Sequence, residues 1–493
     1  SRLVHRAREH RGPLTLVFHG PDVAGKRRVA EALAREAGAL LLVADLAQSL
    51  ENPAELPRTL RLVFREARFH DALLYLEGVE ALDEQHASLR RYLQEALASS
   101  RGIAIVADPR PERPAHSPDG GYPAGAIGVP FPVPTHARRR ECWRSSLATA
   151  GVELEPADLE ALAGRYRLLP DQIEAAVATA SGRARWHAAT SARPELDGHP
   201  SVRDLFAAVR THSAGDLGSF ARKVTPSYGW EDIVLPPDRM RQLREICSYV
   251  QYRALVYDEW GFDHKLALGK GLNVLFAGPS GTGKTMAADI IAGELGLDLY
   301  KIDLSAVVSK YVGDTEKHLS RIFAAAEASS SILFFDEADA LFGKRGEVRD
   351  SHDRYANLEV SYLLQRMEEY DGVVILTTNL RKNMDEAFVR RLHFTVEFPF
   401  PDQQDRQRIW ERIWPDRSPL TPELDLSFMS RSFDMAGGSI RNVALGAAFL
   451  AAAEGSAIGM EHLVHATRRE YQKLGKVVSE REFGGYSGQD DAR

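Results

Sequence analysis

The stretch "LNVLFAGPSGTGKT", Leu272–Thr285, decides the fold of this 493-residue chain. A mostly apolar run leads into a turn with the pattern G-x-x-x-x-G-K-T. Between a strand and a helix, such a turn directs backbone N–H groups toward a phosphate, while its lysine reaches the β- and γ-phosphates and its threonine hydroxyl holds Mg²⁺. The motif therefore predicts a parallel α/β sheet that binds ATP, with Lys284 on the phosphates and Thr285 on the metal.

Two further strand ends carry the polar groups that ATP hydrolysis needs. "SILFFDEAD" ends in Asp336, which is placed to hold Mg²⁺, and in Glu337, which is placed to activate water as a general base. "VVILTTN" ends in Asn379, whose amide can orient that water against the γ-phosphate. The alternatives are a helix that happens to start with acids and a turn-forming asparagine.

The chain contains an internal repeat. A first copy, from about residue 12 to 182, and a second, from about 228 to 475, each show a strand, a glycine-containing turn and a helix, followed by further strands. Lys284 follows Lys26 by 258 positions, and Trp410 follows Trp143 by 267. Landmarks in the same order at a nearly constant offset predict two tandem α/β modules, each followed by a small all-helical lid.

The first copy lacks most of the groups that the second copy offers. The counterparts of Thr285, Asp336 and Glu337 are Arg27, Glu77 and Gly78. Asn379 falls opposite Asp108 or Pro109, and Arg390 and Arg391 fall opposite Pro123 and Ala124. We expect no hydrolysis here. Either Lys26 still binds nucleotide, with the charge of Arg27 replacing that of the metal, or the domain serves packing alone.

Composition narrows the classes of partner. The chain has 62 Lys and Arg against 69 Asp and Glu, a net charge of −7, so nucleic acid is an improbable main ligand. Its two cysteines, Cys142 and Cys247, argue against a disulfide framework or a zinc cluster and favour a cytoplasmic protein. We expect no membrane span, because no apolar run approaches the ~20 residues that one needs.

From about Tyr228 to Gln472 the sequence resembles the AAA family of ATPases, within the AAA+ class. "YGWEDIVLP" resembles the entry segment of the family, and "AGGSIRN" resembles the start of its lid helix. The resemblance implies ATP and Mg²⁺ as cofactors. It also implies a set of nucleotide-binding residues: Asp232, Ile233, Pro279, Ser280, Gly281, Thr282, Gly283, Lys284, Thr285, Met286 and Arg441.

"LTTNLRKNMDEAFVRRLHF" resembles the second region of homology of the same family, with Asn379 as its sensor. This resemblance implies that Arg390 and Arg391 are arginine fingers, which complete the site of a neighbouring subunit in a homo-oligomeric ring, usually a hexamer. The family often has Gly-Arg-Phe after the pair, where this chain has "LHF" with His393, so Arg391 is the preferred finger. A solvated basic patch is the alternative.

"SKYVG" resembles the first pore loop of the family, in which an aromatic side chain grips an extended polypeptide. The resemblance gives this role to Tyr311, flanked by Lys310 and Val312; the alternative is a half-buried loop tyrosine. The charged run at 343–355 coincides with the second pore loop of the family, although a solvated loop would explain it equally well.

Together these features predict a tandem AAA ATPase. The expected boundaries are a degenerate α/β subdomain at 1–134, its lid at 135–182, a linker at 183–226, an active α/β subdomain at 227–401, a lid at 402–475 and a tail at 476–493. The expected function is a protein-remodelling motor that unfolds, threads or disassembles protein substrates. A nucleic-acid loader ATPase and a nucleotide-gated scaffold are the alternatives. The chain also resembles tandem bacterial AAA proteins associated with phage-tail-like contractile injection systems.

Overall fold

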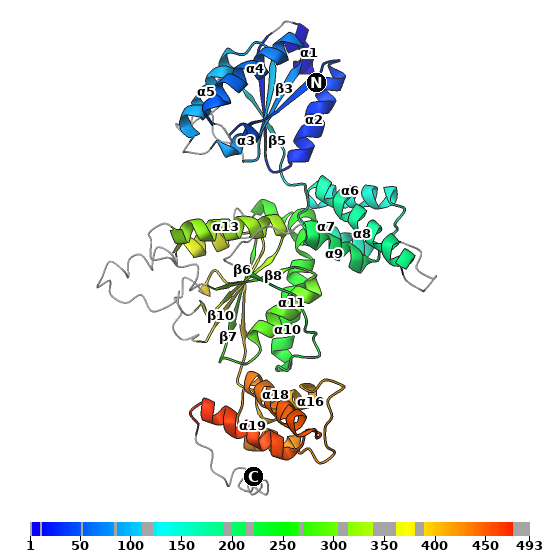
Figure 1. Cartoon of the computed structure of the whole chain (residues 1–493), viewed down its shortest axis with the longest axis vertical. Coiled ribbons are helices and arrows are strands. Elements are labelled where there is room, and N and C mark those ends of the chain that lie inside the picture. The colour runs from blue at the N-terminus through cyan, green and yellow to red at the C-terminus, as the bar shows by residue number, and fades with distance from the viewer. Residues whose placement is uncertain are drawn as a thin grey trace, which may run out of the picture. The chain divides into compact units, whose positions relative to one another are not determined.

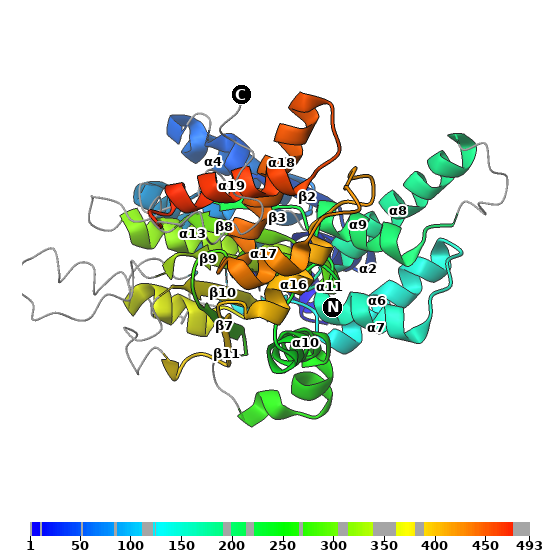
Figure 2. The same ribbon diagram turned by 90° about the horizontal axis from the view of Figure 1, so that it is seen from below.

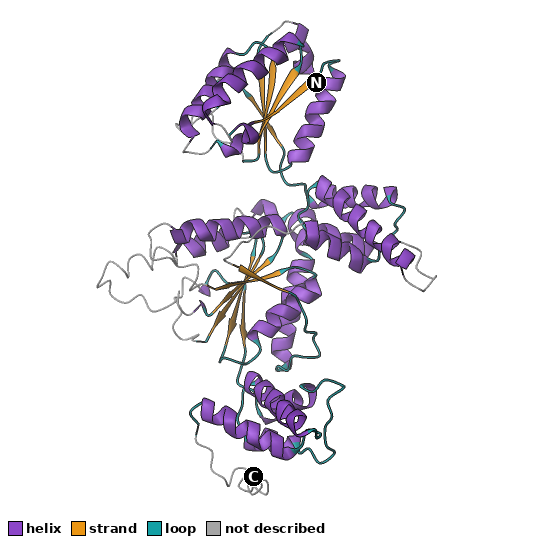
Figure 3. Ribbon diagram, viewed as in Figure 1, coloured by secondary structure: helices purple, strands orange, loops and turns teal. Residues whose placement is uncertain are grey.

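The computed structural model describes residues 2–9, 12–50, 53–82, 86–110, 122–123, 125–190, 199–212, 221–265, 270–303, 314–338, 361–379 and 389–476. The chain divides into two compact units. One contains Ser1–Glu153 and Arg167–Ser201, and the other contains Leu154–Tyr166 and Val202–Arg493. Each unit contains one β-sheet with helices packed around it (Figures 1 and 3).

The first unit has a five-stranded parallel sheet in the order β2-β3-β4-β1-β5. Its strands are β1 (Leu14–His19), β2 (Leu41–Asp45), β3 (Leu73–Glu77), β4 (Ile103–Asp108) and β5 (Ile127–Pro130). Its first helices are α1 (Arg2–Glu9), α2 (Val23–Glu36), α3 (Leu46–Ser49), α4 (Leu56–Phe69) and α5 (Ala87–Ser99), with 3₁₀ turns at Pro53–Glu55 and Val79–Ala81.

Alternation along β3 explains why this sheet is covered on both faces. Leu74 and Leu76 belong to the buried cluster that includes side chains of α4 and α5. Leu73 and Tyr75 belong to the other cluster, which includes side chains of α1 and α2. Successive side chains of a strand point to opposite faces, so a continuous apolar run requires helices on both faces of a parallel sheet.

The second unit has a six-stranded sheet in the order β11-β7-β10-β9-β8-β6. Its strands are β6 (Ala221–Val224), β7 (Leu272–Ala277), β8 (Leu299–Asp303), β9 (Ile332–Asp336), β10 (Val373–Thr378) and β11 (Phe394–Glu397). The five strands other than β6 are parallel and repeat the strand order of the first unit. The repeat is thus present at the level of topology.

We expected a parallel sheet, and the five repeated strands form one. The whole second sheet is mixed, because its edge strand β6 pairs antiparallel with β8. β6 precedes the repeated unit, so no strand–helix–strand crossover fixes its direction. The faces of the sheet are covered by α10 (Pro237–Gln251) and α11 (Lys284–Leu295) on one side and by α13 (Asp314–Ser329) on the other (Figures 1 and 2). A π-helical turn at Leu255–Glu259 and a 3₁₀ turn at Phe262–Lys265 follow α10.

The second lid is built from helices, apart from one isolated β-bridge between Leu420 and Ile458. It contains α16 (Gln403–Arg412), α17 (Leu426–Ser432), α18 (Gly437–Glu454) and α19 (Met460–Lys473). The fully buried Trp410 joins Met429, Phe433 and Ile440 in its core. Asp402 caps α16, because its carboxylate accepts a hydrogen bond from the N–H of Asp405 at 2.8 Å.

The helices that follow the first sheet are α6 (His136–Thr149), α7 (Pro156–Arg165), α8 (Pro170–Thr190) and α9 (Val202–His212). Here the structure differs from the expected linker, because α8 continues to Thr190 and α9 forms within the segment assigned to it. Ala184, at the start of the expected linker, is buried on α8 together with Ala180 and Ser181, which come just before it. Small residues therefore mark a tightly packed helix face here.

No helix in the described parts of the chain combines the length and the apolar character that crossing a bilayer requires.

Candidate functional site

The turn between β7 and α11 has the conformation of a phosphate-binding loop. Gly281 and Gly283 have φ values of 78° and 100°, and α11 begins only at Lys284. These left-handed conformations suit glycine, and they let successive N–H groups face one concave surface at a helix N-terminus. The backbone is thus shaped for an anion before any side chain contributes.

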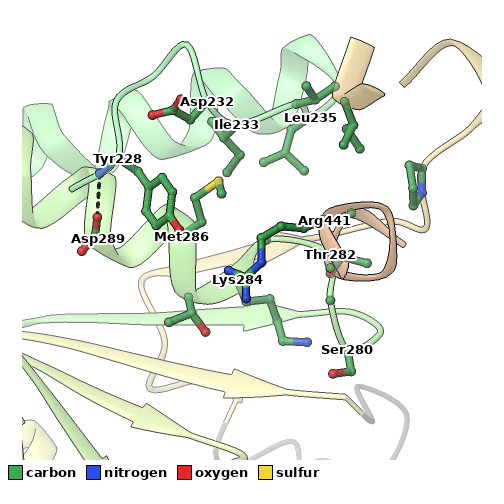
Figure 4. A pocket seen from close by; sticks show the side chains of 18 of the residues that line it. Tyr228, Asp232, Ile233, Leu235, Ser280, Thr282, Lys284, Met286, Asp289 and Arg441 are labelled. Carbon is green, nitrogen blue, oxygen red and sulfur yellow. Dashed lines mark hydrogen bonds between the residues drawn. The ribbon is translucent and has the colours of Figure 1, made fainter. Parts of the chain in front are cut away.

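This loop forms one wall of a cavity of about 590 Å³ between the second α/β subdomain and its lid. Figure 4 shows side chains of many of the residues that line it. The sequence-predicted residues that the cavity brings together are Asp232, Ile233, Ser280, Gly281, Thr282, Gly283, Lys284, Thr285, Met286, Asp336, Glu337, Asn379 and Arg441. Of the predicted loop residues, Pro279 contributes its carbonyl, which accepts a hydrogen bond from Lys284 Nζ at 2.9 Å.

Lys284 links the loop to the end of β10. Its ammonium group also donates to the carbonyl of Gly278 at 2.5 Å and to Oδ1 of Asn379 at 2.9 Å. The lysine and the asparagine amide, predicted from separate motifs, therefore meet at one point of the cavity. A cation beside an inward-facing amide nest fits the terminal phosphates of a nucleotide.

The acidic end of β9 is held rigidly. The Thr377 hydroxyl donates to Asp336 Oδ1 at 2.6 Å, and the Glu337 N–H donates to Thr377 Oγ1 at 3.0 Å. Burial raises the pKa of Asp336, but hydrogen bonds from Lys301 and Thr377 outweigh it and keep that pKa below its usual value. The Asp336 carboxylate and the Thr285 hydroxyl are oxygen groups of the kind that Mg²⁺ prefers, so the residues present fit this metal.

Glu337 adopts a conformation that is rare for its residue type. Its φ is 52°, in the left-handed region, and its counterpart Gly78 in the first copy has a φ of 76°. A non-glycine residue pays on the order of 1 kcal/mol for this conformation. The strain places an exposed carboxylate in the cavity beside Asp336, where a general base for hydrolysis would be needed.

Sequence reasoning missed several residues of the wall opposite the phosphate loop. Asp289, buried in α11, accepts hydrogen bonds from the N–H groups of Ser227 at 2.9 Å and Tyr228 at 3.0 Å. Asp289 thereby fixes the entry segment that carries Tyr228 and Ile233 into the cavity (Figure 4). A single acid within the apolar run of α11 was the available signal, because buried carboxylates require partners.

The lid contacts the phosphate loop directly. The N–H of Gly438, in the first turn of α18, donates to the carbonyl of Gly281 at 2.9 Å. Arg441, one turn further along, extends from α18 into the cavity (Figure 4). A movement of the lid would therefore also displace the phosphate loop and any phosphate bound to it.

The arginine pair lies elsewhere. Arg390 and Arg391 are exposed before β11 and are not among the residues that line the cavity; Arg391 pairs with Glu368. The first pore-loop residues Lys310, Tyr311 and Val312, and the charged run at 343–355, lie outside the described residues.

The corresponding loop of the first copy has a different conformation. α2 begins at Val23, so Val23, Ala24 and Gly25 are helical where the second copy has its glycine turn. Asp22 Oδ1 accepts a hydrogen bond from the N–H of Gly25 at 2.7 Å. The chain's own carboxylate therefore takes the backbone donor that a phosphate would use.

The remaining groups of the first copy are also engaged. Lys26 is fully buried, and its ammonium donates to the carbonyls of Gly20 at 2.7 Å and Asp108 at 3.0 Å. Burial lowers the pKa of Lys26. Arg27 lies 3.7 Å from Glu77.

Strand register settles which residue of the first copy stands at the position of Asn379. His19 pairs with Asp108 as Ala277 pairs with Thr378. Pro109 therefore takes the place of Asn379, and this site has no amide at that position.

The fold and the cavity of the second copy define a P-loop nucleotide-binding protein. Comparison with known proteins narrows this class. Residues 274–401 match the family "ATPase family associated with various cellular activities (AAA)". Residues 135–215 match "Contractile injection system ATPase helical domain". The chain thus contains an AAA ATPase domain and, before it, a helical domain of the contractile injection system ATPase type.

Its relatives include an ATP-dependent protease, a cell division cycle protein and a proteasome subunit. The chain is 37% identical over 257 residues to the ATP-dependent zinc metalloprotease FtsH 3 of Sphaerobacter thermophilus, a match that covers 50% of each chain. It is 26% identical to the cell division cycle protein 48 homolog of Archaeoglobus fulgidus across 94% of this chain and 66% of that protein. It is 31% identical to the 26S proteasome subunit RPT4 of Saccharomyces cerevisiae across 48% of this chain and 57% of that subunit. The chain spans half to two thirds of the length of these relatives.

Proposed function

We propose that the second copy binds ATP with Mg²⁺ and hydrolyses it, and that the released energy drives the remodelling of protein substrates. The observation that carries the proposal is the convergence of the phosphate loop, Asp336, Glu337 and Asn379 in one cavity that residues of the lid also line. AAA ATPases use ATP and Mg²⁺ as their cofactors, in agreement with the oxygen groups and the cation present.

Each side chain has a role that follows from its place. The loop N–H groups and Lys284 hold the phosphates, and Thr285 and Asp336 hold the metal. Mg²⁺ would neutralise charge on the transferred phosphoryl group. Glu337 accepts the proton of the attacking water, which Asn379 orients from the end of β10. Ile233 and Met286 offer apolar surface beside the loop for the base of the nucleotide.

The proposal includes assembly into a homo-oligomeric ring, a hexamer by analogy with the AAA family. Arg390 and Arg391 are exposed and lie away from their own cavity, as a residue that completes a neighbour's site must. Tyr311, with Lys310 and Val312, would grip substrate in the pore. Both cysteines are free thiols, which suits a cytoplasmic location.

The helical-domain match supports one class of substrate, the protein components of a contractile injection system. In this proposal the first copy binds no nucleotide and serves as a structural or regulatory tier. Its support is the closed loop at Asp22 and Gly25 and the buried Lys26.

Glu337→Gln tests the proposed hydrolysis. The variant should keep ATP affinity, because the phosphate loop is untouched, while steady-state phosphate release falls about 10²- to 10⁴-fold through loss of the general base. Glu77→Gln in the first copy is the control, because it changes an acid at the same edge of the first sheet, at the position of Asp336, and should leave phosphate release unchanged.

Phosphate release by Glu337→Gln at the wild-type rate would contradict the proposed mechanism. The alternative functions give different results in the wild-type chain. Stimulation of phosphate release by DNA but not by unfolded protein would favour a nucleic-acid loader. Nucleotide binding without steady turnover would favour a nucleotide-gated scaffold.

A further inference from the structure

Asp336 has a partner that no motif predicts. Lys301, on β8 next to β9, places its Nζ 2.5 Å from Asp336 Oδ2. The other carboxylate oxygen accepts the Thr377 hydroxyl and the Glu337 N–H. The carboxylate is therefore held from both sides, and a full positive charge lies beside one of its oxygens.

Lys301 reaches this carboxylate from outside the nucleotide cavity. Asp336 and Thr377 line the cavity, whereas Lys301 is not among its lining residues in the described part of the chain. The lysine side chain remains 39% exposed, so its ammonium can move into water when a stronger cation arrives. On the cavity side, Thr285 remains accessible for a metal.

The first copy supplies a cation to its acid by a different route. Arg27, at the position of Thr285, lies 3.7 Å from Glu77. The strand position of Lys301 is occupied there by Val43, which pairs with Tyr75 as Lys301 pairs with Phe334. In the first copy, Arg27 on α2 puts its positive charge where the metal would bind. In the second copy, Lys301 approaches Asp336 from the neighbouring strand β8 and leaves the metal position beside Thr285 accessible.

We propose that Lys301 is a positioning residue whose ammonium group competes with the divalent metal for the Asp336 carboxylate. The inference rests on the proposed function, because it assigns a metal to Thr285 and Asp336. Positive charge next to a metal ligand lowers its affinity for a second cation, so the metal must share or displace the ammonium group. Lys301 thereby sets the metal affinity of the site.

The test measures metal affinity without turnover. Mn²⁺ is titrated into the full chain in the presence of ATPγS, and free Mn²⁺ is counted by electron paramagnetic resonance. Lys301→Met should lower the Mn²⁺ dissociation constant about three- to tenfold, the order expected for removing one nearby charge. A merely structural role for Lys301 would leave the constant unchanged or raise it.

Lys223→Met is the matched control, because Lys223 Nζ forms a similar ion pair at the sheet edge, 2.6 Å from Asp298 Oδ2, and neither residue is among those that line the cavity. It should leave the Mn²⁺ constant at the wild-type value, and so should Lys301→Arg, which keeps the charge. In an Asp336→Asn background, Lys301→Met should have no effect.

An unchanged or weaker Mn²⁺ affinity in Lys301→Met, or a changed affinity in Lys301→Arg, would overturn the inference while leaving the proposed function intact. A wild-type chain that binds no Mn²⁺ in the presence of ATPγS would instead contradict the proposed function itself.

Discussion

The two loops Gly20–Arg27 and Gly278–Thr285 share their first two residues and the Gly-Lys pair near their end, yet they fold differently. In the second loop Gly281 and Gly283 turn through left-handed conformations, and the helix begins at Lys284. In the first, Val23 and Ala24 stand in the positions of Gly281 and Thr282, and the helix begins three residues earlier. A β-branched residue is strained in the left-handed region, so the first loop closes into a helical turn.

The two lysines show what this difference changes. Lys284 lines the cavity and contacts Asn379, so a phosphate can exchange with its present partners. Lys26 is fully buried, and its ammonium group donates to the carbonyls of Gly20, just after β1, and of Asp108, at the end of β4. The lysine therefore connects these two strands. The lysine of the second copy is therefore placed to bind a ligand, whereas the lysine of the first copy stabilises the fold. A retained lysine is not sufficient evidence for a nucleotide site.

Of the changes to these two loops, the largest expected effect comes from replacing one of the two lysines. Lys284→Met should weaken ATP binding by about a hundredfold or more, because the phosphates lose a charged hydrogen-bond donor. Fluorescence anisotropy of a labelled ATP analogue on the full chain would measure this change.

Lys26→Met is the control for that comparison. It should leave ATP affinity unchanged and instead destabilise the first copy by about 1–3 kcal/mol, because the buried carbonyl of Gly20 loses the lysine as donor. The carbonyl of Asp108 also loses the lysine but keeps the N–H of Gly20. A comparable loss of ATP affinity in both variants would show that the two loops are equivalent.

The smallest expected effect concerns the carboxylate that closes the first loop. Asp22→Ala removes the cap of α2, which typically costs about 1 kcal/mol. Native-state hydrogen exchange of the amides of α2 should speed up about fivefold, while ATP hydrolysis stays at the wild-type rate. Acquisition of ATP binding by the first copy of this variant would contradict the helical closure, since it would mean that Asp22 alone excluded the phosphate.

Much of this arrangement could be predicted from the sequence. Periodic apolar strands, the complete phosphate-loop motif and the constant offset between copies predicted the α/β class and the repeat, which the topology and the family match confirm. The separate motifs at Asp336, Glu337 and Asn379 lie in one cavity because parallel strands bring their carboxyl ends to the same edge of the sheet.

What could not be predicted depends on contacts between residues distant in sequence. Lys301 and Asp336 lie on neighbouring strands but are 35 positions apart in the sequence. Neither the phosphate-loop motif nor the motif that ends in Asp336 and Glu337 contains Lys301. The hydrogen bond from the Tyr228 N–H to Asp289 likewise joins residues that are distant in sequence, in the entry segment and in α11. The segment expected as a linker is partly helical, and Ala184 and Ala208 within it are buried, which composition alone does not reveal.

The central claim is that only the second copy of this chain is a nucleotide site. Equilibrium dialysis of radiolabelled ATPγS against the full chain, with Mg²⁺ in excess, counts bound nucleotide per chain. We predict saturation at one molecule per chain in the wild type and an affinity lowered about a hundredfold or more in Lys284→Met. Saturation at two molecules per chain, or one molecule bound by Lys284→Met with the wild-type affinity, would contradict the account.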